Sequence, residues 1–218
     1  MKIAIILAEF GKPAPDVSQY RECWPDANIG VYSEADCPPV AQFEGDRYGW
    51  RMNDYYSIRK ALENESGADV AIVVDGDMWI CDMPKMRTLP KLDERFGICL
   101  PLNPRYTVAL DTMVGADSDH SPDPLRSGAP GVNCSPVAIS LQNMRAVQLA
   151  HTYCTEMLER PVRGPLAWWR AMERTGTAPL ILPPQWCVCE RHIGIGGEIM
   201  LHHGHDAVKR QYGNLRIA

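Results

Sequence analysis

The chain has 218 residues, of which 45% are hydrophobic and 22% are charged, and its formal net charge is −5. A chain of this length and composition can bury one substantial core, so we expect a single domain over residues 1–218. The acidic balance argues against a general nucleic-acid-binding protein, because no excess of basic residues is present to neutralise phosphates.

Cysteine content and hydropathy bear on the compartment. Eight cysteines in a chain of this length are too few for a disulfide scaffold, and none of them form a Cys-x2-Cys pair. No apolar stretch reaches the length of a membrane span, and the apolar run at residues 3–8 is too short for a signal peptide. We therefore expect a cytoplasmic protein without a membrane span.

Apolar runs and helical patterns alternate along the chain. Continuous apolar runs at 3–8 and 70–74 are typical of strands buried on both faces, and residues 47–64 between them have helical spacing. This alternation predicts a single-domain α/β fold with a mostly parallel sheet flanked by helices. The other strands are expected at 28–33, 96–100, 131–140, 179–182 and 198–205, and the other helices at 13–24, 141–160 and 165–175.

Two polar segments stand apart from this alternation. Residues 103–131 form a long stretch rich in Gly, Pro, Asp and Ser. Such a stretch in a compact domain is usually functional, so we predict an active-site loop there. Residues 206–218 are expected to form a polar, basic C-terminal tail.

The strongest chemical signal follows the apolar run at residues 70–74. Asp75 and Asp77 are separated by Gly76, at the end of a strand where open α/β sheets bind ligands. Residues at spacing two on an extended segment point to the same side, so the two carboxylates could converge on one hard cation. Gly76 would let backbone or ligand come close. The alternative interpretation is a polar loop that caps the strand.

A second cluster lies near the end of the chain. His202, His203 and His205 fall within four residues, at the end of a predicted strand. Two carboxylates and one imidazole suit Mn²⁺, with Mg²⁺ as the alternative, although which histidine would bind is open. Lys209 could contact a phosphate as a compact point charge. The alternative for each of these residues is a solvated tail.

In order, these motifs resemble the retaining GT-A glycosyltransferases, and in particular the glycogenin and lipopolysaccharide-galactosyltransferase group. Residues 75–83 resemble the Asp-x-Asp motif of that group, and residues 133–139 resemble its mid-chain Asn-led strand. Residues 203–209 keep the His-to-Lys spacing of its terminal motif, with Asp206 and Arg210 in place of a glycine and a proline. The Asp-Gln pair that usually precedes the late strand is not evident.

The resemblance implies a GT-A (Rossmann-like) fold and a specific chemistry. The enzyme would move a hexose from a nucleoside-diphosphate sugar, with a UDP-sugar favoured, to an unknown acceptor that could be a glycan, a protein or a small molecule. Asp75, Asp77 and His203 would hold Mn²⁺ (or Mg²⁺) against the diphosphate, and Lys209 would stabilise the leaving group. The residues implied to contact the nucleotide-sugar are Ala8, Glu9, Arg59 (or Arg51), Asp75, Gly76, Asn133 and Lys209.

Two other interpretations remain open at this point. A sugar-phosphate nucleotidyltransferase also combines an α/β sheet with acidic metal ligands, although residues 9–12 match its usual Gly-rich opening loop poorly. A non-catalytic nucleotide-binding relative would explain the altered terminal motif.

Overall fold

The computed structural model describes residues 1–11, 14–44, 50–108, 120–121, 129–159, 164–188 and 197–203. Its main sheet contains eight strands in these ranges. Their bounds are β1 Ile3–Ala8, β2 Asn28–Tyr32, β3 Val70–Val73, β5 Ile98–Val108, β6 His120–Ser121, β7 Ala129–Val132, β8 Val137–Ser140 and β9 Leu180–Leu182. A second, two-stranded sheet pairs β4 (Met78–Ile80) with β10 (Leu201–His203).

Six α-helices and two short 3-10 helices connect the described strands. Their bounds are α1 Ser18–Cys23, α2 Trp50–Glu63, α3 Met83–Met86, α4 Leu89–Phe96, α5 Met144–Glu159, α6 Gly164–Thr175, η1 Ala41–Phe43 and η2 Pro184–Trp186.

The main sheet is mixed, and its parallel pairs lie on either side of one antiparallel strand. Its path runs β2-β1-β3-β8-β5. β1 is parallel to both β2 and β3, and β5 is parallel to β9. β8 is antiparallel to both of its neighbours, β3 and β5. Because β8 runs against β3, the residues that precede β8 lie at the same sheet edge as the residues that follow β3.

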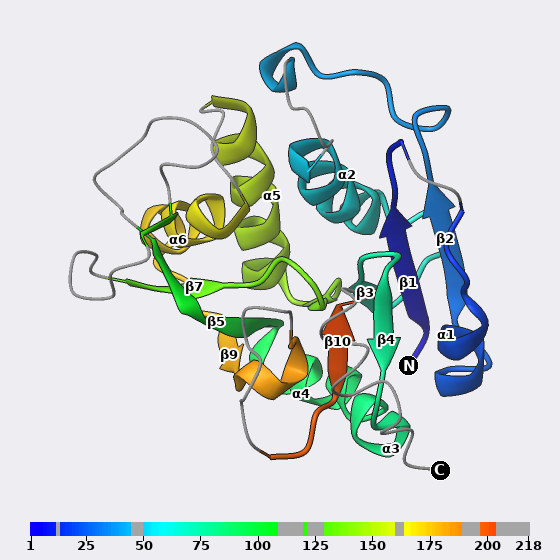
Figure 1. Cartoon of the computed structure of the whole chain (residues 1–218). Coiled ribbons are helices and arrows are strands. Elements are labelled where there is room, and N and C mark those ends of the chain that lie inside the picture. The colour runs from blue at the N-terminus through cyan, green and yellow to red at the C-terminus, as the bar shows by residue number, and fades with distance from the viewer. Residues whose placement is uncertain are drawn as a thin grey trace.

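Helices cover both faces of this sheet, as Figure 1 shows. One hydrophobic cluster joins one face of the sheet to α2, α5 and α6, with Ile58, Leu149 and Trp168 among its buried members. The other cluster joins the opposite face to α1, α3, α4 and the small β4–β10 sheet, with Tyr20 and Met86 among its members. The continuous apolar runs of β1 and β3 follow from this burial on both sides.

Close packing dictates the glycine at the start of α6. A Cβ at Gly164 would lie 2.6 Å from Asp54 Oδ2 on α2 and 2.9 Å from the Tyr153 hydroxyl on α5, and it would also meet Cys134. The ring of Tyr153 stacks on Trp168, with centroids 4.1 Å apart. Only glycine lets α6 approach α2 and α5 this closely.

Some element boundaries differ from the sequence expectation. The expected strand at 131–140 is two strands, β7 and β8, joined by a link at residues 133–136. The predicted loop at 103–131 is partly strand, since β5 continues to Val108 and β6 and β7 also fall within it. Residues 109–119 and 122–128 of that loop, and the tail at 206–218, lie outside the described residues.

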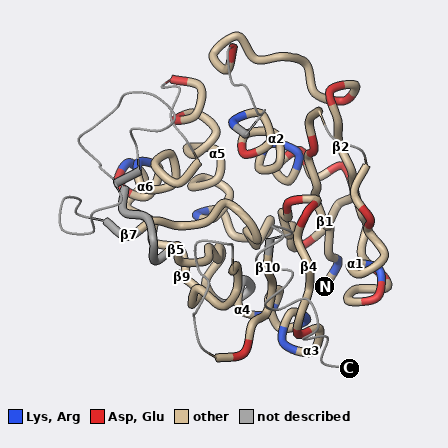
Figure 2. The backbone as a smooth tube through the Cα atoms, viewed as in Figure 1, with Lys and Arg blue, Asp and Glu red and all other residues tan. Residues whose placement is uncertain are grey.

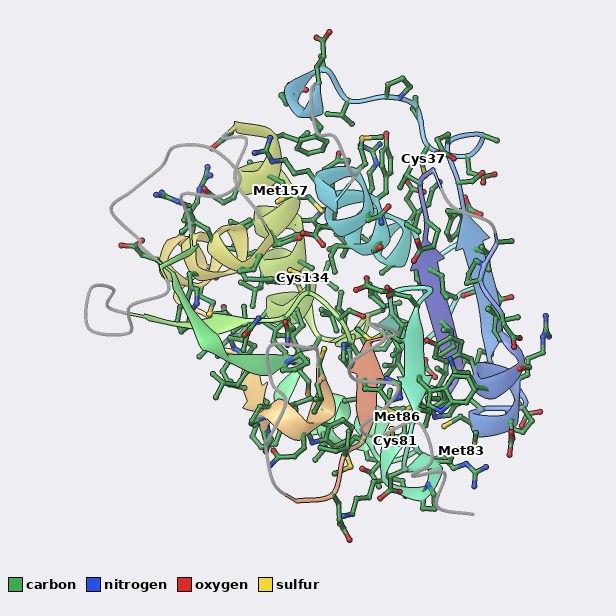
Figure 3. The ribbon with its side chains drawn as sticks, in the orientation of Figure 1. Cys37, Cys81, Met83, Met86, Cys134 and Met157 are labelled. Carbon is green, nitrogen blue, oxygen red and sulfur yellow. The ribbon has the colours of Figure 1, made fainter. Side chains whose placement is uncertain are left out.

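The described part of the chain contains no helix long and apolar enough to cross a membrane. The seven cysteines described in the structure are all free thiols. Three of them, Cys37, Cys81 and Cys134, lie in separate parts of the fold (Figure 3).

Candidate functional site

Three chain segments converge at the carboxyl edge of the parallel strands. β1 is followed by Glu9, and β3 is followed, after Val74, by Asp75. β8 runs antiparallel to β3 and begins at the same edge, because Val137 pairs with Val73. Ser135 lies two residues before β8. Residues that are far apart in the sequence are therefore neighbours at this edge, which is where open α/β sheets bind ligands.

Asp75 to Met78 form a β-turn rather than the extended segment expected from the sequence. The Met78 amide donates to the Asp75 carbonyl at 3.2 Å, with Gly76 and Asp77 at the centre of the turn. The prediction of an extended segment at Asp75 to Asp77 was therefore wrong, and the convergence of the two carboxylates on one cation stays a prediction. The physical reason for the turn is that the chain leaves the main sheet after β3 and must bend to enter the second sheet at β4.

Side chains from three other segments bind the backbone of this turn. The Asp75 amide donates to Ser135 Oγ at 2.8 Å, and the Gly76 amide donates to Glu9 Oε1. Glu9 is only 4% exposed, so its carboxylate is oriented toward this turn within the protein. The Tyr20 hydroxyl donates to the Asp75 carbonyl over 3.5 Å. The position of the Asp-Gly-Asp segment is thus set by tertiary contacts.

The electrostatics of the turn are strongly negative. Burial raises the pKa of Tyr20 well above its ordinary value, and the charges of Asp75, Asp77 and Glu9 raise this pKa further. The Tyr20 hydroxyl therefore stays protonated and can donate. In Figure 2, acidic positions drawn in red gather just above the label of β4. Carboxylates that repel one another favour a bound cation, which would remove that repulsion.

The second sheet places β10, a strand late in the chain, beside the strand that follows this turn. β10 pairs antiparallel with β4, so the His203 backbone lies opposite Met78, the residue after Asp77 (Figure 1). His202 lies opposite Trp79 and is buried, with 1% of its surface exposed. The His203 side chain is outside the description, as are residues 204–210 with His205 and Lys209.

The donors at this turn have the chemistry that a divalent cation requires. Asp77 is exposed and Asp75 is half-buried, so carboxylate oxygens are accessible at the sheet edge. Carboxylates suit Mg²⁺ and Mn²⁺, and Mn²⁺ also accepts imidazole. Among the described side chains no group of three His, Cys, Asp or Glu residues could hold a metal ion. A third protein ligand would therefore have to come from outside that set, and the imidazole of His203 is the one that the sequence predicts.

Two other predicted contacts lie on β1 and α2. Ala8 pairs with Tyr32 at the end of β1, and its side chain is buried in the core. The Arg59 guanidinium is bound to Glu63 at 3.1 Å and to the Tyr55 hydroxyl at 2.8 Å. Glu63 and Tyr55 belong to α2, the same helix as Arg59. Its role toward a donor stays a prediction.

Asn133 joins three parts of the fold close to Ser135. Its Oδ1 accepts from Asn103 Nδ2 at 3.0 Å, and its Nδ2 donates to the Cys187 carbonyl at 3.4 Å. Its backbone amide donates to the Pro101 carbonyl at 2.8 Å. The half-buried side chain of Asn133 is thus oriented by β5 and by the segment after η2, at the edge where Asp75 lies.

Sequence reasoning missed Gln19, Tyr20 and Ser135, which support the turn from two distant segments. Gln19 and Tyr20 lie on α1, about 55 residues before the turn, and Ser135 lies 60 residues after it. No local pattern marks them. The one hint in the sequence is that Ser135 lies two positions after Asn133, within the segment 133–139 that resembles the Asn-led strand.

Comparison with known proteins shows likeness of fold rather than of sequence. No protein-family model matches the chain, and no curated protein matches it in sequence. Among solved structures, it is similar to a glycosyltransferase involved in the glycosylation of the major capsid of PBCV-1, with a TM-score of 0.58 and 11% identity over 100% of both chains. It is also similar to apo mouse xyloside xylosyltransferase 1, with a TM-score of 0.52 and 14% identity over 94% of this chain and 97% of that one.

The chain therefore has a fold found in glycosyltransferases. The expected single-domain α/β architecture, with a mostly parallel mixed sheet flanked by helices, is confirmed. Since both neighbours are below 15% identical to the chain, this likeness covers the fold and leaves the reaction to be argued from the site.

Proposed function

We propose that this protein is a metal-dependent glycosyltransferase that moves a hexose from a nucleoside-diphosphate sugar, with a UDP-sugar favoured, to an acceptor. One observation carries the proposal. The turn with Asp75 and Asp77 lies at the carboxyl edge of the parallel strands in a fold found in glycosyltransferases, and the backbone of His203 lies beside it through the pairing of β10 with β4. Asp75 and Asp77 lie more than 120 positions before His203 in the sequence, and the resemblance to the GT-A glycosyltransferases implies that these three residues hold one cation.

Mn²⁺ or Mg²⁺ bound by Asp75, Asp77 and His203 would act as a Lewis acid on the diphosphate of the donor. The protein contributes the position of the carboxylates. Ser135 and Glu9 bind the amides of residues 75 and 76, so the turn does not need to reorganise when a ligand arrives. Lys209 would add positive charge where the leaving diphosphate becomes more negative. Retention of configuration belongs to the same proposal.

A thermal-shift screen tests the ligand class. UDP with Mn²⁺ at about 100 times its dissociation constant should raise the melting temperature by roughly 5–10 °C, because such binding stabilises the folded state by about 2.7 kcal/mol. Other nucleoside diphosphates should give smaller shifts. Asp77→Ala should abolish the Mn²⁺-dependent part of the shift.

Asp26→Ala is the matched control, because Asp26 is exposed and precedes β2 at the opposite edge of the sheet. Its shift should equal that of the wild type. No shift with any nucleotide or nucleotide-sugar would contradict the proposal. A large shift without turnover of any donor would instead support a non-catalytic nucleotide-binding protein, and pyrophosphate release from a nucleoside triphosphate plus a sugar phosphate would support a nucleotidyltransferase.

A further inference from the structure

Gln19 on α1 makes a paired contact with β4. Its Nε2 donates to the Met78 carbonyl at 2.6 Å, and its Oε1 accepts from the Ile80 amide at 2.8 Å. Residues 78 and 80 are two positions apart on the strand, so their backbone polar groups point to the same edge of β4. The carboxamide therefore takes the place that a neighbouring strand would have in a larger sheet.

The opposite edge of β4 is paired with β10. The register sets Met78 opposite His203 and Ile80 opposite Leu201. The order across this small sheet is thus Gln19, β4 and β10. Each strand has only three residues, and an isolated two-stranded pair of this length is marginal in water. Contacts from outside the pair must therefore contribute to its fixed position.

The helix that presents Gln19 is itself anchored. Arg87, which follows α3, donates to the carbonyls of Cys23 at 2.9 Å and Glu22 at 3.1 Å, at the C-terminal end of α1. Tyr20 is fully buried against the same part of the protein and contacts the Asp75 carbonyl. Gln19 is therefore presented by an anchored helix to β4, the strand that directly follows Asp77.

We propose that Gln19 is a positioning residue for the cation and diphosphate site. By binding the Met78 carbonyl and the Ile80 amide on the edge of β4 that faces α1, it fixes Asp77 directly before that strand and, through β10, fixes the backbone of His203. This role rests on the proposed function. Gln19 does not touch the reacting groups, and its effect would pass through the β4 backbone.

Three variants test this role. Gln19→Leu keeps the approximate size of the side chain and removes both hydrogen bonds. Gln19→Glu keeps an acceptor for the Ile80 amide but sets a negative oxygen against the Met78 carbonyl. Gln148→Leu makes the same chemical change at an exposed position of α5, and serves as the control.

Affinity for Mn²⁺ in the presence of UDP is the main measurement, made by the electron paramagnetic resonance signal of free Mn²⁺. Gln19→Leu should weaken Mn²⁺ binding about 10-fold, Gln19→Glu should weaken it less, and Gln148→Leu should leave it unchanged. Hydrogen exchange of the Ile80 amide should be faster in Gln19→Leu without any added ligand. With a donor that is turned over, the Gln19 variants should lower kcat/KM by a similar factor.

Unchanged Mn²⁺ affinity in both Gln19 variants, with faster exchange at Ile80, would overturn the positioning role and leave Gln19 as a structural contact alone. If Gln19→Leu does not fold, Mn²⁺ affinity and hydrogen exchange at Ile80 are compared between Gln19→Glu and the wild type. Absence of Mn²⁺ and UDP binding in the wild-type protein is a separate result, since it removes the proposed function and the positioning role together.

Discussion

Gly76 occupies a position with no room for a side chain. A Cβ built there would lie 2.6 Å from Glu9 Oε1 and 2.8 Å from Pro15 Cβ. Its amide also donates to the same Glu9 carboxylate. The glycine thus allows a buried carboxylate to approach the backbone between Asp75 and Asp77, which couples the end of β1 to the candidate cation site. The sequence predicted close approach at Gly76, but Glu9 as its neighbour could not be read from it.

Gly76→Ala should therefore lower both stability and ligand binding. The added methyl group must displace Glu9 or the turn, and overpacking of this kind costs about 1–3 kcal/mol in the free energy of unfolding. Urea denaturation measures this loss, and the thermal shift with UDP and Mn²⁺ should shrink in parallel.

Gly67→Ala is the matched control. A Cβ at Gly67 meets nothing within 4 Å, but the backbone has a φ of +61°. Its cost of about 1 kcal/mol would be conformational, and the ligand-induced shift should be kept. A Gly76→Ala variant with wild-type stability and a full ligand shift would contradict the close approach.

At the scale of elements, continuous or periodic patterns predicted well and short pairings did not. β1, β3, α5 and α6 lie within a few residues of their expected positions, because their apolar residues alone specify burial on two faces or on one. β4 was not predicted as a strand. It has three residues, and its partners are Gln19 and β10, which are distant in the sequence. Such non-local contacts leave no periodic signal.

The candidate site divides in the same way. Asp75 and Asp77 could be named from the sequence because charge directly after a buried strand is a local pattern. The geometry of their turn could not be predicted, because it depends on the entry of the following residues into the second sheet at β4. Ser135, Tyr20 and Gln19 act through backbone groups of the turn, so their roles depend on tertiary structure alone.

Across the whole molecule, buried thiols add a pH dependence to stability. Burial raises the pKa of Cys23, Cys81 and Cys154 from 9.0 to about 12, and that of Cys37 to about 11. For Cys23, the neighbouring Arg87 opposes part of this rise. The folded protein therefore keeps protons on these groups that the unfolded chain releases near pH 9.

Stability should consequently be at its full value below about pH 9 and fall as the pH rises toward 11, because the unfolded state then binds fewer protons than the folded state. Urea denaturation between pH 7.5 and 10.5 measures this fall. The double variant Cys23→Ala/Cys81→Ala should be less stable at pH 7.5, because two cavities are created, yet should lose stability less steeply above pH 9.

Charge repulsion in an acidic protein also lowers stability at high pH, but it acts equally on the wild type and on the double variant. A difference between their slopes therefore reports the ionisation of the thiols. Equal slopes above pH 9 in the wild type and the double variant would contradict the thiol account. Tyr20 and Tyr153, whose pKa values are raised well above 10.0 by burial, should contribute only above pH 10.

The measurement closest to the central claim is turnover of a nucleotide-sugar. Purified protein is incubated with a panel of UDP-sugars, with Mn²⁺ or with EDTA, and UDP release and any glycosylated product are followed by mass spectrometry. We expect UDP release from at least one donor that requires the metal and falls by roughly 100-fold or more in Asp77→Asn, because the carboxylate that holds the cation is lost. Full activity in EDTA, or the same activity in Asp77→Asn as in the wild type, would contradict a metal-dependent glycosyltransferase site at Asp75 and Asp77.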